Sequence, residues 1–497
     1  MSTNDKITGY ENEKIYNRDI PDIPEILKEK ELPPRKNSKK IFVIIGFAVL
    51  AILIVAGIIF SAFNTVEIAG KKYKKNDTTV SIYDANLSPE DIDAIKKMKA
   101  VSYINLSNCS LPGTDLSWIT DSTTLSLKNC GLTDEHLKTI DFKSLDLTSF
   151  DIDGNKDITD LFALVDVSDT LKTVSFNLCS VSDISFTENL TKLNSLYADS
   201  NGISDISSLE NCKRLQILSI NDNQIESIET LSNCSELREF YVNSNNLTSL
   251  NGLEKAIRLE VIEADNNNIN DFSGLADTSV LKKVSLKNNN STDERLLSGI
   301  LVKSAELLKE LHLDGNLFEE FDSVGKLKLL KILTVDECKY LSSLDFLKTL
   351  TVIERFSARS CALTTLKGMK NCRSLTYLEL SDNDIISIDD LPDFNQPNVY
   401  LNLSNNSLTD IYLPEQSFST LSLYGNNLDK LDISETSGGE IIVGYCNAFD
   451  YATVTGKYHK YKLIDIPLDK QAAVGNAINS YSVEFLSADE YIDSLSK

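Results

Sequence analysis

The stretch 193–203 reads LNSLYADSNGI and decides the fold of the chain, because its pattern returns several times at a fixed interval. Within it, apolar residues stand at Leu193, Leu196, Ala198 and Ile203, and an asparagine stands at Asn201. Equivalent asparagines follow at steps of 22 residues, at Asn223, Asn245, Asn267 and Asn289. A constant period of about 20 to 29 residues indicates a chain built from stacked copies of one structural unit.

The order of residues within one unit has a physical explanation, which the next copy illustrates. Leu218 and Ile220 alternate with polar residues, which indicates a short strand with one buried face. Asn223 stands where the chain leaves this strand, and its amide can donate to and accept from backbone groups that the bend leaves unpaired. Apolar residues such as Ile225 and Leu231 then fill the space behind the strand. One unit cannot bury this face alone, so several copies must stack.

The pattern L-x-x-L-x-L-x-x-N/C-x-L at this period is that of the leucine-rich repeat. It predicts an α/β solenoid, a leucine-rich-repeat horseshoe with a parallel β-sheet on the concave face and short 3₁₀, irregular or helical segments on the convex side. We place the repeats at residues 101–446. One repeat is lengthened by residues 292–308, whose apolar spacing predicts a true helix in place of a short turn.

Segments at both ends of the repeats are predicted to be caps. Residues 64–100 form a linker and an N-terminal cap, in which Ser88 and Pro89 have the residue types of a helix start. Residues 447–497 form a mixed C-terminal cap with a helix at 469–478, a strand at 482–486 and a helix from 488. A small independent binding module is the alternative interpretation of this second segment. Terminal repeats need covers because an open end exposes apolar surface and strand edges.

Two further segments precede the repeats. Residues 1–40 are polar and charged with four prolines, which is typical of a disordered cytoplasmic tail. Residues 41–63, from Ile41 to Phe63, are an apolar run of 23 residues without a charge, long enough to form a transmembrane helix. A cleaved signal peptide is the alternative, although its apolar region is usually about 7–15 residues and nearer the N-terminus. We predict an uncleaved signal-anchor in the cell membrane.

The orientation of this single-pass anchor follows from the flanking charges. Arg35, Lys36, Lys39 and Lys40 lie directly before the apolar run, which places the N-terminus in the cytoplasm and the repeats outside. A second lysine cluster at 71–75 lies on the other side, further from the bilayer, and leaves the reverse orientation open.

Charge and cysteine usage narrow the range of functions. A net charge of −24 argues against a nucleic-acid partner, which requires a basic surface, and fits either a solubilising surface or a preference for basic partners. All nine cysteines fall at positions that pack into the repeats, so we predict buried thiols. Stacked neighbours such as Cys109 and Cys130 could instead form a disulfide. No metal-ligand spacing or catalytic motif occurs, so we predict no metal, no cofactor and no enzyme.

Strand residues that alternate with the buried leucines face the concave surface and are the candidates for binding. One outward column contains Tyr197 and Tyr241, and the next contains Asp199 and Asp265. With two neighbouring glutamates they form a predicted aromatic and acidic patch consisting of Tyr197, Asp199, Glu239, Tyr241, Glu263 and Asp265. Exposed tyrosine is a frequent contact residue in interfaces. The alternative is that these are β-favouring surface residues without a partner.

The copies with Asn-x-Ile-x-(Asp/Ser)-Ile, as in residues 201–206, resemble the bacterial internalin-like leucine-rich-repeat proteins and are similar to the phosphatase-regulator type of eukaryotic repeat. The resemblance covers residues 80–446 and implies a curved solenoid used for protein recognition. An apolar N-terminal segment stands where internalins typically carry a cleaved signal peptide, and the immunoglobulin-like domain and wall-anchoring motif of internalins have no counterpart after the repeats. Adhesion and host invasion are therefore not implied.

Two functions follow as hypotheses. The first is a cell-surface binding module that recognises a protein or glycan partner through its concave face. The second is a structural or regulatory subunit of a membrane complex, without a ligand on that face. The sequence fixes neither the partner nor the oligomeric state.

Overall fold

A computed structural model describes residues 64–98, 101–444, 457–477 and 482–495. The chain divides into a unit Met1–Asn64 and a unit Thr65–Lys497, and the fold reported below is that of the second unit. The predicted tail at 1–40 and the predicted membrane span at 41–63 lie outside the described residues. Within the described residues, no helix combines the length and apolar character needed to cross a membrane.

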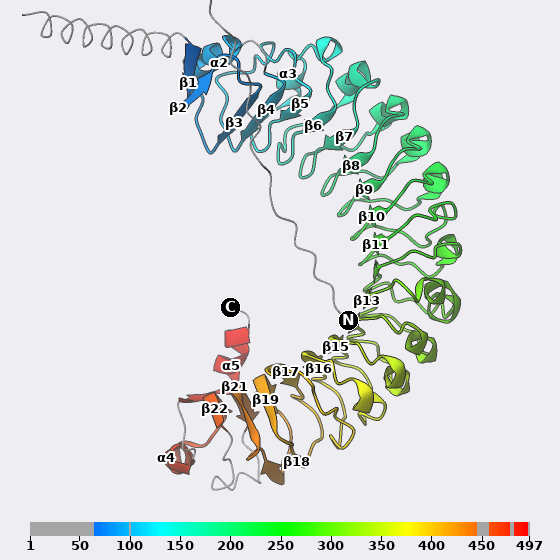
Figure 1. Cartoon of the computed structure of the whole chain (residues 1–497), viewed down its shortest axis with the longest axis vertical. Helices are drawn as coiled ribbons and strands as arrows, with labels where there is room; N and C mark the ends of the chain where they lie inside the picture. Colours follow the sequence, from blue (N-terminus) through cyan, green and yellow to red (C-terminus); the bar gives the residue numbers. More distant parts are fainter. Residues whose placement is uncertain (1–63, 99–100, 445–456, 478–481, 496–497) are drawn as a thin grey trace, which may run out of the picture. The chain divides into compact units, whose positions relative to one another are not determined.

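One parallel β-sheet runs through the unit Thr65–Lys497, and its strands pair in chain order. They are β3 (Thr79–Tyr83), β4 (Tyr103–Ser107), β5 (Thr124–Ser126), β6 (Ser149–Asp151), β7 (Thr173–Ser175), β8 (Ser195–Tyr197), β9 (Ile217–Ser219), β10 (Glu239–Tyr241), β11 (Val261–Glu263), β12 (Lys283–Ser285), β13 (Glu310–His312), β14 (Ile332–Thr334), β15 (Arg355–Ser357), β16 (Tyr377–Glu379), β17 (Val399–Asn402), β19 (Gln416–Ser422), β21 (Thr436–Gly444), β22 (Lys457–Ile464) and β23 (Val483–Leu486). Figure 1 shows these strands along the inner side of the unit and the short helices on its outer side. The predicted leucine-rich-repeat solenoid is confirmed.

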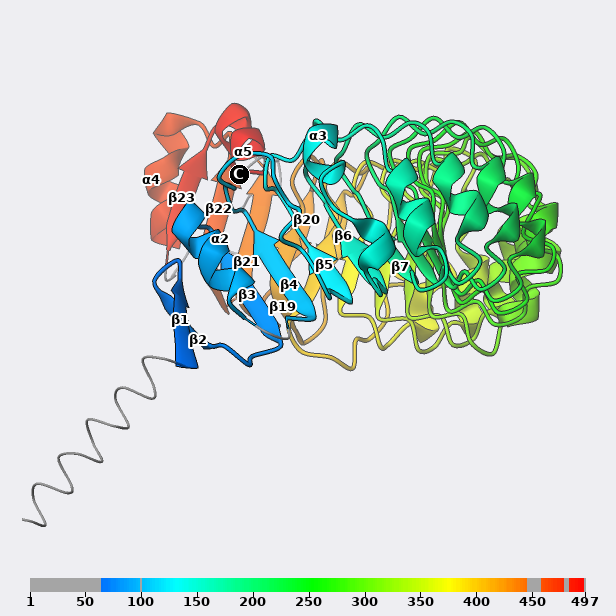
Figure 2. The ribbon, with the colours of Figure 1, turned by 90° about the horizontal axis from the view of Figure 1, so that it is seen from above.

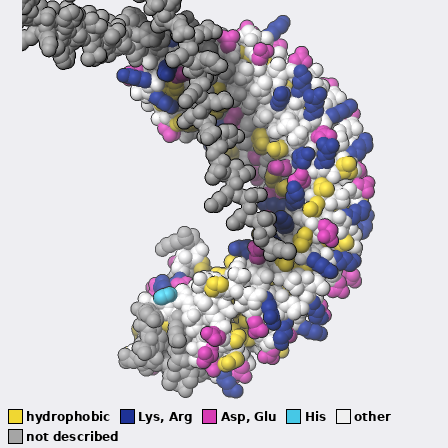
Figure 3. Space-filling view, in the orientation of Figure 1, with side chains coloured by type: hydrophobic (Ala, Val, Ile, Leu, Met, Phe, Trp, Pro, Cys, Tyr) yellow, Lys and Arg dark blue, Asp and Glu magenta, His cyan; other side chains and the backbone are white. Residues whose placement is uncertain are grey.

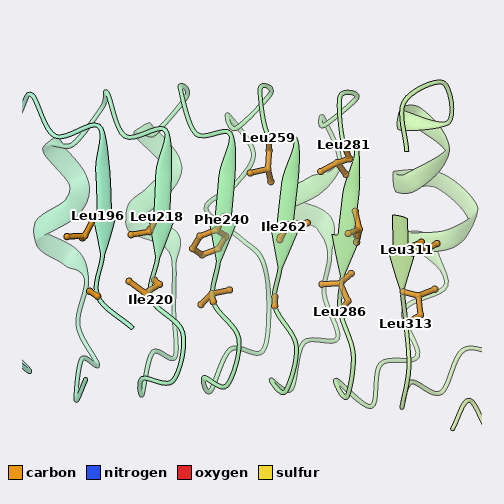
Figure 4. Close-up of a cluster of buried hydrophobic side chains, with 14 of the residues drawn as sticks. Leu196, Leu218, Ile220, Phe240, Leu259, Ile262, Leu281, Leu286, Leu311 and Leu313 are labelled. Carbon is orange, nitrogen blue, oxygen red and sulfur yellow. The ribbon is translucent and has the colours of Figure 1, made fainter. Parts of the chain in front are cut away.

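The register of the sheet stacks equivalent apolar residues on one another. Leu218 pairs with Leu196 on one side and with Phe240 on the other, and Phe240 pairs in turn with Ile262. All four side chains are fully buried, and Figure 4 shows them projecting from neighbouring strands into one continuous core. Each such side chain contributes roughly 1.5–3 kcal/mol of burial free energy. The stack therefore supplies the nearest-neighbour stabilisation that a solenoid requires.

The asparagine that ends each strand closes the turn in the way its chemistry predicts. The Nδ2 group of Asn223 donates to the carbonyls of Ala198, Ile220 and Asn221 at 2.9, 3.2 and 2.9 Å. Its Oδ1 atom accepts from the backbone N–H of Ile203 in the preceding repeat at 3.0 Å. We call this place in the repeat the turn position. The same set of bonds recurs at the equivalent asparagines, so each turn is tied to its neighbour.

Short helical turns cover the convex side. The 3₁₀ segments are η1 (Phe142–Ser144), η2 (Phe162–Val167), η3 (Ser185–Asn189), η4 (Ser207–Asn211), η5 (Glu229–Asn233), η6 (Ser273–Leu275), η8 (Leu301–Ser304), η9 (Asp322–Lys326), η10 (Asp345–Thr349) and η11 (Met369–Asn371). The prediction of a true helix at 292–308 is wrong. A π-helical turn, η7 (Leu296–Ile300), forms there and runs directly into η8. Leu296, Leu297 and Ile300 are all buried in it, so the insertion is shaped by filling the core before the chain re-enters the sheet.

The N-terminal end is covered by a small hairpin and a helix. Strands β1 (Thr65–Ile68) and β2 (Lys71–Lys74) pair antiparallel, and α2 (Pro89–Lys96) follows β3. The side chain of Ser88 accepts from the N–H of Asp91, and the Asp91 carboxylate accepts from the N–H of Ser88 at 2.8 Å. The predicted helix start is confirmed. Asp91 also accepts from the N–H of Ala69 at 2.7 Å, which ties α2 to the hairpin turn. A shorter helix, α3 (Asp134–Leu137), begins after Thr133.

The sheet continues beyond the last predicted repeat. Strand β22 pairs with β21 and β23 with β22, both parallel, so the segment after residue 446 extends the sheet. Helix α4 (Leu468–Ala477) joins the two strands, and α5 (Ala488–Leu495) follows the second. Figure 2 shows both helices beside the last strands. A separate parallel pair, β18 (Asp410–Tyr412) and β20 (Lys430–Asp432), replaces the helical turns of two late repeats.

The described cysteines are free thiols inside the repeats. Seven are buried as predicted, and Cys361 is partly exposed. The thiol of Cys130 lies 3.0 Å from the carbonyl oxygen of Leu106, a bond of the kind that the turn asparagines make. Cys446 lies outside the described residues.

Candidate binding surface

Each repeat strand presents side chains to the concave surface at three successive outward positions. In the repeat of β8 these are Ser195, Tyr197 and Asp199, which alternate with the fully buried Leu196 and Ala198. The alternation is that of any strand with one buried face. The three positions stack across the sheet into columns, which we call the first, second and third outward columns.

The predicted patch lies on this surface, and the structure brings its central members together. The hydroxyl of Tyr241 donates to the Glu239 carboxylate at 2.9 Å, while Lys283 contacts the Glu263 carboxylate at 2.8 Å. Burial, and then the neighbouring Glu239, raises the pKa of Tyr241, so its hydroxyl stays protonated and acts as a donor. Tyr197 and Tyr241 are both partly buried instead of fully exposed, because neighbouring strands crowd them.

The two aspartates of the patch have a structural task that the sequence did not reveal. Asp199 accepts from the hydroxyl of Ser219 at 2.8 Å and from the N–H of Asn221 at 2.7 Å, both in the next repeat. Asp265 accepts in the same way from the hydroxyl of Ser285 and the N–H of Lys287. These carboxylates therefore hold neighbouring strand ends together. The tyrosines and glutamates of the patch remain the groups available for contact with a ligand.

A second cluster on the concave surface was not predicted. The ring of Tyr377 stacks on that of Tyr400 with 4.6 Å between centroids and 6° between planes. The guanidinium carbon of Arg355 lies 4.2 Å from the Tyr377 ring centroid. Beside this stack, the buried Glu379 accepts from the amide of Asn402 at 2.9 Å and from the hydroxyl of Tyr400 at 3.3 Å. We call Arg355, Tyr377 and Tyr400 the aromatic stack.

The aromatic stack was missed because the sequence argument followed only two outward columns. Arg355, Tyr377 and Tyr400 occupy the first outward column in three consecutive repeats, the position that Ser195 has in β8. A count of aromatic residues in that column would have found them. Arginine and tyrosine stacked at adjacent strands form the type of rigid, amphipathic surface that dominates protein interfaces.

The last strands of the sheet are covered on their concave side by the chain itself. Tyr491 of α5 packs on Ile442 and Ile464, which occupy outward positions of β21 and β22. Its ring also meets that of Tyr424 edge-on, with 5.4 Å between centroids. Neither the predicted patch nor the aromatic stack contributes to this cluster. The C-terminal helix thus closes one end of the surface and leaves both candidate regions uncovered by it.

The residue types that bind metals are scattered over the described part of the chain. No group of three or more His, Cys, Asp or Glu side chains is arranged there to hold a metal ion. His312 lies in β13 with Nδ1 2.9 Å from the hydroxyl of Thr334. Burial, with Lys287 acting in the same direction, lowers the pKa of His312 to about 4, so the ring is neutral at physiological pH.

Comparisons with known proteins agree with this architecture. The family model described as "Leucine Rich repeats (2 copies)" matches residues 213–255. Acidic leucine-rich nuclear phosphoprotein 32 family member A of Drosophila pseudoobscura pseudoobscura is 34% identical over 105 residues, which cover 20% of this chain and 40% of that protein. The chain thus spans less than half the length of this curated relative, and the Drosophila melanogaster protein of the same name matches with the same coverage.

Several solved structures share the fold over much of the chain. An internalin, InlF, of Listeria monocytogenes is 24% identical, with 66% of this chain and 91% of that one covered and a TM-score of 0.52. The functional domain of InlJ from the same organism, which includes a cysteine ladder, is 19% identical with 71% of this chain and 76% of that one covered and a TM-score of 0.55. A leucine-rich-repeat protein of Leptospira interrogans is 20% identical, covers 71% and 86%, and has a TM-score of 0.53.

These likenesses establish the class. The chain is a leucine-rich-repeat solenoid with the fold of the internalin structures. Figure 3 shows that Lys and Arg side chains are interspersed with Asp and Glu side chains over the visible face.

Proposed function

We propose that this protein is a cell-surface binding module without enzymatic activity, which recognises a protein or glycan partner through its concave face. The observation that supports this role is the presence of two aromatic and charged clusters on that face, the predicted patch and the aromatic stack. They lie on strands β8–β11 and β15–β17, several repeats apart. Such a separation suits an extended partner better than a small metabolite, because neighbouring strands are about 4.8 Å apart.

The proposed location rests on the apolar run 41–63, which would hold the protein in the cell membrane as a single-pass anchor. In this arrangement residues 1–40 are cytoplasmic and the repeats lie outside. Protease treatment of intact cells should degrade the repeats and spare the tail, as detected with tags at each end. Survival of the repeats in intact cells, followed by their loss after lysis, would reverse this topology.

Binding can be tested with residues 65–497, which form a compact unit with their own core. This fragment should capture a specific extracellular protein or glycan. The double variant Tyr197→Ala/Tyr241→Ala should bind it about thirtyfold more weakly, since buried tyrosines at an interface each contribute roughly 1 kcal/mol. Tyr340→Ala is the matched control, because Tyr340 is 54% exposed and lies outside the outward columns. Equal capture by all three proteins would remove the patch from the proposal.

The hypothesis of a structural or regulatory subunit makes a different prediction. In that case an unrelated apolar sequence placed at 41–63 should abolish assembly of the complex, while the fragment 65–497 binds nothing.

A further inference from the structure

A depression of about 550 Å³ lies on the edge of the solenoid where the chain enters strands β7–β10, and its residues carry an unusual charge. It is lined by Lys172, Thr173, Lys192, Asn194, Arg214, Gln216 and Glu236. Three consecutive repeats each supply one cation: Lys172 directly precedes β7, and Lys192 and Arg214 lie three residues before β8 and β9. The protein as a whole has a net charge of −24, so a concentration of positive charge is unexpected here.

The cations of this depression differ from those further along the same edge. Arg238 contacts the Glu260 carboxylate at 2.9 Å and Lys282 contacts it at 2.5 Å, so both are neutralised by a neighbour. Arg258 is paired in the same way with Glu236. The one carboxylate that lines the depression, that of Glu236, is therefore already occupied by a cation from the next repeat.

Within the described residues, Lys172, Lys192 and Arg214 have no carboxylate within 4.0 Å. The ammonium of Lys192 donates only to the backbone carbonyl of Asp169. The three cations line the same depression, where like charges repel one another. The unmatched cations therefore create a local field that attracts an anion.

Neutral donors complete the depression. The hydroxyl of Ser195 donates to Oδ1 of Asn194 at 3.0 Å, which leaves the amide hydrogens of Asn194 as donors. Thr173 and Gln216 add a hydroxyl and a second amide. Arginine provides a planar pair of donors that suits a phosphate or sulfate, and lysine provides a mobile point charge.

From this arrangement we infer that the edge beside β7–β10 is a binding site for a phosphate or sulfate group. The site adjoins the concave face through Thr173 of the first outward column, but it contains no residue of the predicted patch or the aromatic stack, so it does not depend on the proposed function. Lys192 and Arg214 occupy equivalent positions in successive repeats, whose strands are about 4.8 Å apart, so the site can engage one oxyanion or adjacent oxyanions of one molecule.

The inference is tested by calorimetric titration and thermal unfolding of the fragment 65–497 with inorganic phosphate and with inorganic sulfate, against sodium chloride at equal ionic strength. Either oxyanion should raise the unfolding temperature above the chloride value, because a ligand that binds only the folded state stabilises it. The variant Lys172→Gln/Arg214→Gln should bind at least tenfold more weakly, because two charge-assisted hydrogen bonds to the oxyanion are lost.

A control variant separates the site from a general charge effect. Lys328→Gln/Lys370→Gln removes the same charge from exposed lysines outside the depression and should bind as the unaltered fragment does. Unchanged circular dichroism verifies that each variant is folded. Absence of any shift beyond chloride, or equal affinity of the two variants, overturns the inference.

Two further probes identify the source of the oxyanion. Dextran sulfate that binds more tightly than the free ion indicates a sulfated or phosphorylated polymer. Vesicles containing a phosphate-headgroup anionic lipid that bind the fragment, while neutral vesicles do not, indicate a lipid headgroup. Binding of the free ion alone indicates a small solute. In each of the three cases, binding should be weakened in the variant Lys172→Gln/Arg214→Gln.

Discussion

The central repeats and those on either side of them place different residues at the same turn position. From Asn201 to Asn316 the turn position is asparagine in every repeat, whereas the flanking repeats mix the two residue types, with Cys130, Asn155 and Cys179 on one side and Cys338, Cys361 and Asn383 on the other. Asparagine both donates and accepts. The cysteine thiol is a weak donor, and its sulfur is only a weak acceptor. The comparison shows which part of the turn the fold requires in every repeat.

Asn245 and Cys338 show the difference in detail. Nδ2 of Asn245 donates to three carbonyls at 2.9 to 3.2 Å, and Oδ1 accepts from the N–H of Ile225 at 2.9 Å. The thiol of Cys338 keeps only a contact of 3.4 Å with the carbonyl of Leu313. The bond to the carbonyl of the preceding repeat is common to both. The acceptor function and the bonds to carbonyls of the same repeat are therefore the parts that a repeat can lose, and we expect repeats with a turn asparagine to be more tightly coupled than those with a turn cysteine.

The largest effect should come from removing a turn asparagine. Asn245→Ala leaves several buried carbonyls and the N–H of Ile225 without their partner, at roughly 1–3 kcal/mol for each unsatisfied group after partial relaxation. We expect a loss of about 3 kcal/mol in the free energy of local opening, measured by hydrogen exchange at the Ile225 amide. Asn246→Ala is the matched control, because its exposed side chain makes no such bonds in the described structure. Similar exchange rates in both variants would contradict the role assigned to Asn245.

A smaller effect should follow removal of a turn cysteine. Cys338 is fully buried, so Cys338→Ala creates a small cavity and removes one weak hydrogen bond. The expected loss is about 1.5 kcal/mol, measured by hydrogen exchange in the repeat of β14. A loss as large as that of Asn245→Ala would show that asparagine and cysteine are equivalent at this position, contrary to the comparison.

The features that could be predicted from the sequence are those that depend on neighbouring residues. The strands, the turn asparagines and the helix start at Ser88 depend on residues within one repeat or one helical turn, so local spacing predicted them. The position of α5 depends on contacts of Tyr491 with Ile442 and Ile464, which belong to no periodic pattern.

In the candidate site, too, the positions of side chains could be predicted, but their contacts with the next repeat could not. Local alternation placed Tyr197 and Tyr241 on the concave face, and the structure has them there. The structural task of Asp199 depends on Ser219 and Asn221 in the next repeat, a contact that one repeat in isolation cannot reveal. Burial and pairing between repeats thus decided which predicted residues remain available to a ligand.

The smallest expected effect is a pH dependence of stability that repeats with a turn cysteine have and repeats with a turn asparagine lack. Burial raises the pKa of Cys338 from 9.0 to about 12, and burial likewise raises that of Cys361 to about 12, while asparagine does not titrate. A thiol with a raised folded pKa contributes stability that is complete below pH 9 and is lost as pH rises towards 12. Between pH 8 and 9.5 we expect a loss of somewhat less than about 1 kcal/mol for each buried thiol.

Tyrosines and lysines titrate in the same pH range, so the change in the free energy of unfolding has to be compared between two proteins. Denaturant unfolding of the fragment 65–497 and of Cys338→Ala/Cys361→Ala at pH 8 and pH 9.5 provides it. The double variant should lose less stability over this interval than the unaltered fragment, because two of the groups that ionise on unfolding are gone. Hydrogen exchange should place the change in the repeats of β14 and β15, and leave the repeats with turn asparagines unaffected. An equal loss in both proteins would mean that the turn cysteines already ionise in the folded state, and that their burial is less complete than the packing of Cys338 indicates.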